Sequence, residues 1–238
     1  MSGPTVSYIL AVYNGRQYLT EALGSIRAQS RPVEEIIVVD DGSTDDSAEI
    51  AEGFGPPVRC IRQKNAGQSA ARNHGVRVSR GDMLGFLDCD DLIHPEKIER
   101  QLRRFAEAPE LVFLDAYARN FWSPEIPEDK RQLPNWQTLT HSDQPWPEFI
   151  ATWLFRREVW QRVGEFDENR KFAEDSDWHD RVRFTGLPME TMRVVLARRR
   201  LHQANLTLNN YDDHIAGLQR FYKEKMARQR EQGKVEKS

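Results

Sequence analysis

The chain has 238 residues, enough for one large α/β domain with a full hydrophobic core. Its 34 basic and 37 acidic residues give a formal net charge of −3, so the overall charge does not favour a nucleic-acid partner. Two cysteines, Cys60 and Cys89, are too few for a disulfide framework or a cysteine zinc site, which favours a reducing compartment.

The first twelve residues lack a basic region followed by a long apolar run. No stretch approaches the roughly 20 apolar residues that a membrane helix needs. We therefore expect a cytoplasmic protein without a transmembrane segment. Peripheral contact with the inner face of a membrane stays open.

The first half of the sequence alternates short apolar runs with segments of helical periodicity. The strands predicted from these runs are 6–12, 36–39, 58–62, 83–87 and 111–114. Helices are predicted at 19–26, 69–77 and 98–105. The strand at 36–39 is apolar throughout, which implies burial on both faces. This alternation predicts an α/β, Rossmann-like fold with a central, mostly parallel sheet flanked by helices.

The segment 119–148 has a different character. Its prolines oppose regular structure, and Trp122, Trp136 and Trp146 are interleaved with them, so we expect a long functional loop. Beyond it a strand is predicted at 149–155, followed by helices at 157–163 and 172–184. The last segment, 211–238, is predicted to be a charged helix whose apolar stripe docks on the domain or on a second subunit.

Three acids, Asp88, Asp90 and Asp91, stand within four residues at the end of the predicted strand 83–87. Carboxylates this close raise each other's pKa unless a cation or hydrogen bonds compensate, so the cluster favours a hard divalent cation. The alternative is a solvated turn in which Asp91 begins the next helix. The cluster alone does not decide between the two.

A second acidic run follows the buried strand 36–39. Its members are Asp40, Asp41, Gly42, Ser43, Thr44 and Asp45. Open α/β sheets bind ligands beyond the carboxyl ends of their strands, so a ribose or a base could be recognised here. An ordinary turn that caps the following helix is the alternative. The glycine-rich dinucleotide fingerprint is absent from the sequence, which argues against a nicotinamide or flavin enzyme.

A polar segment at 64–73 precedes and enters the helix predicted at 69–77. Lys64, Gly67 and Arg72 suit the positioning of a polar, anionic ligand. The alternative is a loop and an amphipathic helix in which Arg72 pairs with a surface acid.

Together these segments resemble family 2 glycosyltransferases, which are nucleotide-sugar enzymes of the GT-A fold. The resemblance is close over residues 6–91 and good over 164–183. It implies that the nucleotide pocket is lined by Ala11, Val12, Tyr13 and Asn14. It also implies that Asp41 contacts the uracil or ribose, with Asp40 beside it. Lys64, Gly67 and Arg72 would border the nucleotide and the sugar.

The family's metal motif, aspartate-any-aspartate (DXD), falls on Asp88, Cys89 and Asp90. By this resemblance Asp90 is a direct ligand of Mg²⁺ or Mn²⁺. Asp88 would touch the ribose or reach the metal through water, and Cys89 belongs to the donor-binding segment. His202 lies where many relatives have a histidine that reaches the metal or the diphosphate, although a surface histidine is the alternative. The arginines at 198–200 could meet the diphosphate or be solvated.

The second matching stretch contains Glu174 and Asp175. In the family the second acid of this pair is the general base, which assigns to Asp175 the removal of a proton from the acceptor hydroxyl. The alternative is a solvated helix start, where acids favour the positive end of the helix dipole. Asp177 and Arg181 stand four residues apart and are expected to form a structural pair.

The resemblance implies a metal-dependent, inverting transfer of one sugar from a nucleoside-diphosphate sugar, commonly a UDP-sugar, to a hydroxyl group. The acceptor is an unknown glycan, lipid-linked or other hydroxyl compound, and the tryptophans of 119–148 suit sugar rings or the packing of a lid. We expect one GT-A domain over 1–210, with a nucleotide-binding half at 1–117 and an acceptor-binding half at 118–210. The helix 211–238 follows, and a homodimer through it stays open.

Two other functions compete with this interpretation. A nucleotidyltransferase also places acids and metal at strand ends, but it would have a glycine-rich, basic loop near the N-terminus. The segment 12–16 of this chain has one glycine, Gly15. A nucleotide-sugar binding module without turnover would share every donor-side feature. Asp175 would then have no catalytic role.

Overall fold

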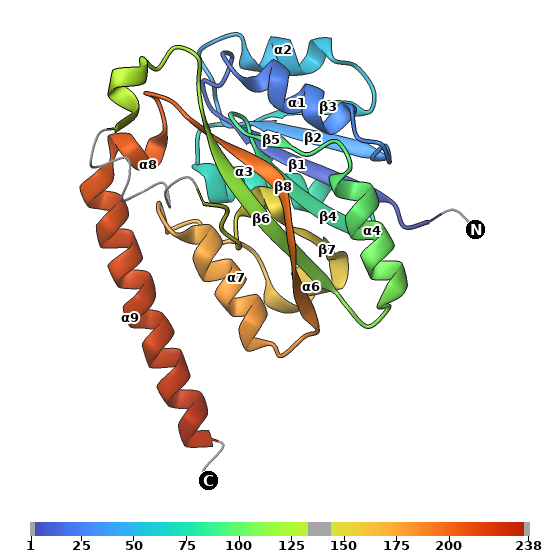
Figure 1. Cartoon of the computed structure of the whole chain (residues 1–238), viewed down its shortest axis with the longest axis vertical. Helices are drawn as coiled ribbons and strands as arrows, with labels where there is room; N and C mark the ends of the chain where they lie inside the picture. Colours follow the sequence, from blue (N-terminus) through green and yellow to red (C-terminus); the bar gives the residue numbers. More distant parts are fainter. Residues whose placement is uncertain (1–2, 133–143, 236–238) are drawn as a thin grey trace.

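The computed structural model describes residues 3–132 and 144–235. An eight-stranded sheet lies at its centre in the order β3-β2-β1-β4-β7-β6-β8-β5, with helices on both faces (Figure 1). The strands are β1 Val6–Val12, β2 Glu35–Asp40, β3 Val58–Arg62, β4 Met83–Asp88, β5 Leu92–Ile93, β6 Phe113–Trp122, β7 Leu154–Arg156 and β8 Met189–Leu201. The α-helices are α1 Leu19–Arg27, α2 Ser47–Gly53, α3 Gln68–Val78, α4 Lys97–Glu107, α6 Arg157–Val163, α7 Glu174–Phe184, α8 Leu206–Asn209 and α9 Tyr211–Val235.

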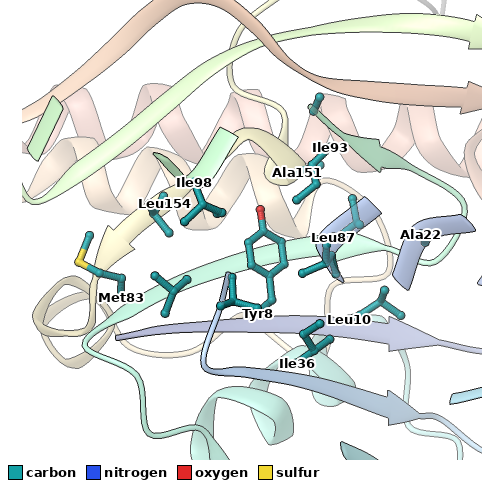
Figure 2. Close-up of a cluster of buried hydrophobic side chains, with 14 of the residues drawn as sticks. Tyr8, Leu10, Ala22, Ile36, Met83, Leu87, Ile93, Ile98, Ala151 and Leu154 are labelled. Carbon is teal, nitrogen blue, oxygen red and sulfur yellow. The ribbon is translucent and has the colours of Figure 1, made fainter. Parts of the chain in front are cut away.

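The strands β1 to β4 form the parallel, Rossmann-like part of the sheet. Side chains of β1 alternate between its two faces. Tyr8 and Leu10 enter a cluster that includes residues of α1 and α4 (Figure 2). Ile9 points to the opposite face, where a β-carbon on Gly75 would lie 2.5 Å from its Cγ2 atom. The helix α3 therefore packs closely on β1 because residue 75 has no side chain.

The second half of the sheet mixes strand directions. Strand β7 is antiparallel to both β4 and β6, β8 is parallel to β6, and β5 is antiparallel to β8. Large aromatic side chains fill the core beneath this half, among them Trp153, Trp160 and Trp178. The prediction of a flanked α/β sheet is thus confirmed, and its parallel order is confined to β1–β4 and the β6–β8 pair.

Most predicted elements of the first half agree with the structure within a few residues. The predicted strand 149–155 is partly wrong, because Ile150–Thr152 forms a 3-10 turn and only the three residues of β7 are strand. An apolar run shows that a segment is buried but does not determine its conformation. Strand β6 extends to Trp122, so the start of the predicted loop 119–148 is strand. Trp136 lies outside the described residues.

Strand β8 was not predicted. Its 13 residues include four arginines and show no regular alternation of buried and exposed positions, so period-2 patterning is weak. Pairing with β6, including a register shift near Tyr117, holds it in the sheet. This strand carries the C-terminal side of the candidate site.

The predicted C-terminal helix is confirmed as α9, which docks on α7 of the same chain (Figure 1). The guanidinium of Arg228 lies 3.0 Å from Asp177 and 3.3 Å from Asp180, and the Lys225 ammonium lies 2.8 Å from Asp180. Phe221 of α9 is buried. None of the described helices is long and apolar enough to cross a membrane.

Candidate active site

The carboxyl ends of three parallel strands meet at one edge of the sheet. Val12 of β1 is paired with Asp40 of β2, and Ala11 is paired with Asp88 of β4. Residues that are up to 77 positions apart in the chain are therefore neighbours. This edge is the place where open α/β sheets bind ligands.

The turn after β1 is tied to the turn after β2. Asn14, at a φ of 52°, accepts a hydrogen bond from the Thr44 backbone N–H at 2.8 Å, and its own N–H donates to Ser43 Oγ at 2.9 Å. Tyr13 extends outward with 53% of its surface exposed. The structure thus brings the predicted nucleotide-pocket residues 11–14 beside the acidic run, with the Tyr13 ring available to a ligand.

Asp41 organises the loop at 63–67. Its carboxylate accepts hydrogen bonds from the backbone N–H groups of Ala66 at 2.9 Å and Gly67 at 2.8 Å, and from Gln63 Nε2 at 2.8 Å. Asp41 is 3% exposed. Lys64 is exposed on this loop, at the same edge of the sheet. Asp41 therefore shapes the predicted donor-binding loop through all three contacts.

Asp40 has a more local contact. It is buried, and its Oδ1 atom accepts a hydrogen bond from the Ser43 backbone N–H at 3.1 Å. The structure therefore supports the turn-stabilising alternative for Asp40. Whether Asp40 also touches a donor stays a prediction.

Arg72 links the end of β4 to the start of α7. It is 2% exposed, and its guanidinium donates to Asp88 Oδ1 at 2.6 Å and to Glu174 Oε1 at 2.8 Å. Burial alone would lower the pKa of Arg72, but the charges of Asp88 and Glu174 outweigh burial and raise it. Arg72 therefore stays a cation, and the alternative in which it pairs with a surface acid is wrong.

The acids of the DXD segment point in different directions. Asp90 Oδ2 lies 2.9 Å from His202 Nε2 and 3.3 Å from Asn205 Nδ2. Asp88 faces Arg72, as described above, and also accepts a hydrogen bond from Gln68 at 3.2 Å. The Cys89 side chain packs against the apolar core. Thus Asp88 and Asp90 each face a different partner, and His202 lies at the site rather than on the free surface.

Asp91 does not begin a helix, so that prediction is wrong. It is buried, the short strand β5 follows it, and its Oδ1 atom accepts a hydrogen bond from the Arg200 backbone N–H at 2.8 Å. Burial, and then the charges of Asp90 and Asp88, raise the pKa of the Asp91 carboxyl well above its usual range. Through this hydrogen bond Asp91 joins β8 to the DXD turn.

The carboxylates of Asp88 and Asp90 are oxygen ligands of the kind that Mg²⁺ and Mn²⁺ prefer. The imidazole of His202 is a ligand type of transition metals. Within residues 3–132 and 144–235, no three His, Cys, Asp or Glu side chains converge enough to hold a metal alone. Metals in phosphate-transfer sites are usually held by one or two carboxylates together with substrate phosphates. The residues fit a metal shared with a diphosphate.

The start of α7 presents two acids in unlike surroundings. Glu174 is 8% exposed, and burial, followed by the charge of Asp175, raises its pKa to about 7 although Arg72 opposes this. Asp175 is half-buried, and its Oδ1 atom accepts a hydrogen bond from the backbone N–H of the next residue, Ser176, at 2.7 Å. Glu174 is thus committed to Arg72, and Asp175 is the acid with the freer carboxylate.

The three consecutive arginines at 198–200 of β8 lie in different surroundings. Arg200 is buried, contacts Glu21 and the Asp90 backbone oxygen, and lies over the Tyr18 ring, so its contacts hold the fold together. Arg198 is exposed and stacks on Phe121. Side chains alternate along a strand, which places Arg199 on the opposite face from these two.

Sequence reasoning missed a second layer around His202. The Tyr18 ring lies 4.5 Å from the imidazole of His202, and its hydroxyl donates a hydrogen bond to Glu125. Ser123 also bonds to Glu125 at 2.5 Å. No sequence motif connects these residues, because Tyr18 is the N-cap residue of α1, whereas Ser123 and Glu125 lie in the loop after β6. Asp177 and Arg181, by contrast, form the predicted pair at 3.1 Å.

Residues 7–164 match the model of glycosyl transferase family 2. The chain belongs to glycosyltransferase family 2. An uncharacterised glycosyltransferase of Rickettsia typhi is 30% identical over 92% of this chain and 72% of its own length. This family 2 glycosyltransferase is therefore an enzyme of nucleotide-sugar chemistry, and the nucleotidyltransferase alternative is set aside.

Solved structures with the same fold include two proteins in complex with a nucleotide sugar. TarS of S. aureus in complex with UDP-GlcNAc superposes with a TM-score of 0.69 at 21% identity, over 87% of this chain and 61% of the TarS chain. A mannosyltransferase of Pyrobaculum calidifontis in complex with GDP-Man and Mn²⁺ gives a TM-score of 0.64 at 19% identity, over 86% and 59%. This family 2 glycosyltransferase thus has the expected GT-A fold and spans about three fifths of either solved chain.

Proposed function

We propose that this enzyme transfers a sugar from a UDP-sugar to an acceptor hydroxyl with inversion, and that Asp175 is the general base. The observation that carries the proposal is the buried bridge from Asp88 through Arg72 to Glu174. It ties the end of β4, where a nucleotide would bind, to the residue that precedes Asp175. A donor and a base are thereby held at a fixed separation, as a direct displacement requires.

The contacts of Asp41 support a donor with a nucleobase N–H. An ionised carboxylate has about four acceptor positions, and three are used by Gln63, Ala66 and Gly67. The remaining position suits an imino N–H, which uracil, thymine and guanine carry and which cytosine and unsubstituted adenine rings lack. TarS was solved with UDP-GlcNAc and the mannosyltransferase with GDP-Man. We place UDP-sugars first and keep GDP- and thymidine diphosphate sugars as alternatives.

Asp90 and His202 would hold Mg²⁺ or Mn²⁺ together with the diphosphate, and Asp88 would contact the ribose or a water of the metal. The metal supplies charge neutralisation for the departing nucleoside diphosphate. Arg72 keeps Asp88 in place and adds a fixed positive charge beside the donor. Tyr13, Asn14, Lys64 and Gly67 would border the donor, with Ala11, Val12, Cys89 and Asp40 beneath them.

Asp175 accepts the proton of the acceptor hydroxyl as that oxygen attacks the anomeric carbon, and the bond to the diphosphate breaks on the opposite side. Its neighbour Glu174 is hydrogen-bonded to Arg72, so Asp175 is the member of the pair that is free for this role. We assign residues 1–117 to the donor and 118–210 to the acceptor, with 211–238 as a docked helix.

The proposal is tested by incubating the full chain with UDP-, GDP- and thymidine diphosphate sugars, with Mn²⁺, with Mg²⁺ and with a chelator. We expect UDP-sugars with a metal to raise the thermal unfolding temperature and to release UDP, faster once a suitable hydroxyl acceptor is added. Equal turnover in the chelator would contradict the metal role. If GDP-sugars alone protected the enzyme from thermal unfolding, the nucleobase of the donor would be guanine instead of uracil.

A further inference from the structure

The side chain of Gln63 lies between Asp41 of the donor site and His74 of α3. Gln63 Nε2 is 2.8 Å from Asp41 Oδ1, and Gln63 Oε1 is 2.7 Å from His74 Nδ1. We infer that Gln63 and His74 are positioning residues that fix the nucleotide-binding loop through Asp41. This inference rests on the proposed nucleotide site at Asp41.

The chemistry of the groups determines the direction of each hydrogen bond. An ionised aspartate only accepts, so the amide nitrogen of Gln63 must face Asp41. The amide oxygen of Gln63 then faces His74, and the nitrogen that approaches it, Nδ1, must carry a proton. The order is therefore His74 to Gln63 to Asp41, with a donor at each step.

We call these two hydrogen bonds, from His74 to Gln63 and from Gln63 to Asp41, the relay. The relay matters because the Asp41 carboxylate determines the shape of the loop at 63–67. Its two oxygens accept the backbone N–H groups of Ala66 and Gly67, and Gly67 has a φ of 93°. On the other side of the loop, a β-carbon on Gly42 would lie 2.9 Å from the Asn65 nitrogen. The loop is thus seated directly on the turn after β2, and a rotation of the Asp41 carboxylate would displace two backbone amides.

His74 itself is not a core residue. It is half-buried, and with Gln63 it lines an open cleft of about 520 Å³ between α3 and Glu168. Replacement of His74 therefore leaves the hydrophobic core intact. A change in nucleotide affinity would then report the lost hydrogen bond rather than unfolding.

The experiment compares His74→Leu with His74→Asn in the full chain. An asparagine places an N–H group near the position of His Nδ1, whereas leucine has no donor. We expect His74→Leu to weaken UDP binding in the presence of Mn²⁺ by roughly 5- to 10-fold, the effect of one hydrogen bond. His74→Asn should bind UDP within about twofold of the wild type. In His74→Leu the KM for the donor should rise while kcat is retained.

A double-substitution cycle tests whether the relay acts as one unit. Gln63→Leu should weaken UDP binding as His74→Leu does, and the double variant should be no weaker than either single one. Wild-type affinity in His74→Leu would overturn the inference, as would a His74→Asn variant as weak as His74→Leu. Additive losses in the double variant would also contradict it.

Amide hydrogen exchange separates this inference from the proposed function. The amides of Ala66 and Gly67 should exchange faster in His74→Leu than in the wild type and recover in His74→Asn, at an unchanged unfolding temperature. This readout needs no nucleotide. If the wild type bound no nucleotide, the proposed function would fail, and unchanged exchange in His74→Leu would overturn the relay separately.

Discussion

The Nζ atom of Lys97 lies 3.0 Å from the backbone oxygen of Trp153, inside the core between α4 and the 3-10 turn that precedes β7. Lys97 is fully buried, and its Nζ also donates to Gln101 at 2.8 Å. Burial lowers the pKa of Lys97 well below its usual range. Lysine side chains are rarely fully buried, yet this one is an internal hydrogen-bond donor.

A pH dependence of stability follows from Lys97. The unfolded chain binds a proton at Lys97 below a pKa of about 10.4, whereas the folded protein binds it only at lower pH. Stability should therefore rise as the pH increases from neutral towards about 10. Lys97→Met should remove this contribution, so the difference in unfolding temperature between the two proteins should change with pH. A constant difference from pH 7 to 10 would contradict a lowered pKa of Lys97 in the folded protein.

The role of Asp175 as base has a direct test. Asp175→Asn keeps the size of the side chain but cannot accept the proton, so kcat should fall by roughly 10²- to 10⁴-fold. UDP affinity should stay at the wild-type value in calorimetry, because the assigned donor contacts lie elsewhere. Glu158→Gln, an exposed carboxylate-to-amide change on α6, is the matched control. Near-wild-type transfer by Asp175→Asn would exclude this base.

Asp90 is expected to act on donor binding. Asp90→Ala should weaken UDP binding in the presence of Mn²⁺ by at least roughly tenfold. Even mutations of residues that only hydrogen-bond to metal ligands lower metal affinity or activity by about 10- to 100-fold. With a chelator present, the wild type and the variant should bind UDP equally. Calorimetry with and without Mn²⁺ measures both effects. An unchanged affinity in Mn²⁺ would remove Asp90 from the metal site.

Arg72→Met should destabilise the fold. The substitution retains an apolar stem but leaves the carboxylates of Asp88 and Glu174 without their shared cation, and removal of one partner from a buried ion pair costs about 3–5 kcal/mol. Urea unfolding measures this loss. Addition of Glu174→Gln to Arg72→Met should recover part of it, and a double variant less stable than Arg72→Met would argue against the bridge.

The docking of α9 is expected to depend on Arg228. Its partners Asp177 and Asp180 are both buried, so Arg228→Met should loosen α9 and speed proteolysis near residue 228. The expected loss is about 1–2 kcal/mol, less than for a fully buried pair because Arg228 is partly exposed. Arg220→Met removes an exposed pair with Glu224 on the same helix and should have little effect. Equal proteolysis of the two variants would contradict ionic docking.

The donor half could be predicted from the sequence because its information is local. Val6–Val12 and 36–39 are apolar runs, and parallel strands bring their carboxyl ends together, so the acids that follow were expected at one edge. The hydrogen-bond partner towards which each acidic side chain points was not predictable. Asp91 follows the same strand as Asp90, yet its partner is the Arg200 amide, supplied by a strand 109 residues later that has no clear pattern of its own.

The same limit applies to the base-bearing side of the site. The resemblance implied that Asp175, the second acid of the pair, is the base, but it did not predict that Glu174 is hydrogen-bonded to Arg72. Tyr18 and Glu125 meet across 107 residues and share no motif. Contacts of this kind arise from tertiary structure, on which local periodicity carries no information.

Asp90 and His202 are 112 residues apart in the chain, and Arg72 and Glu174 are 102 apart. During synthesis the strands β1 to β4 emerge well before α7 and β8. A domain generally folds as a unit. A ribosome-bound chain that ends before residue 174 contains the segment around Asp41 and one partner of Arg72, Asp88. It lacks Glu174, the second partner of Arg72, and His202, the partner of Asp90. The contacts that complete the candidate site can therefore form only after residue 202 has left the ribosome.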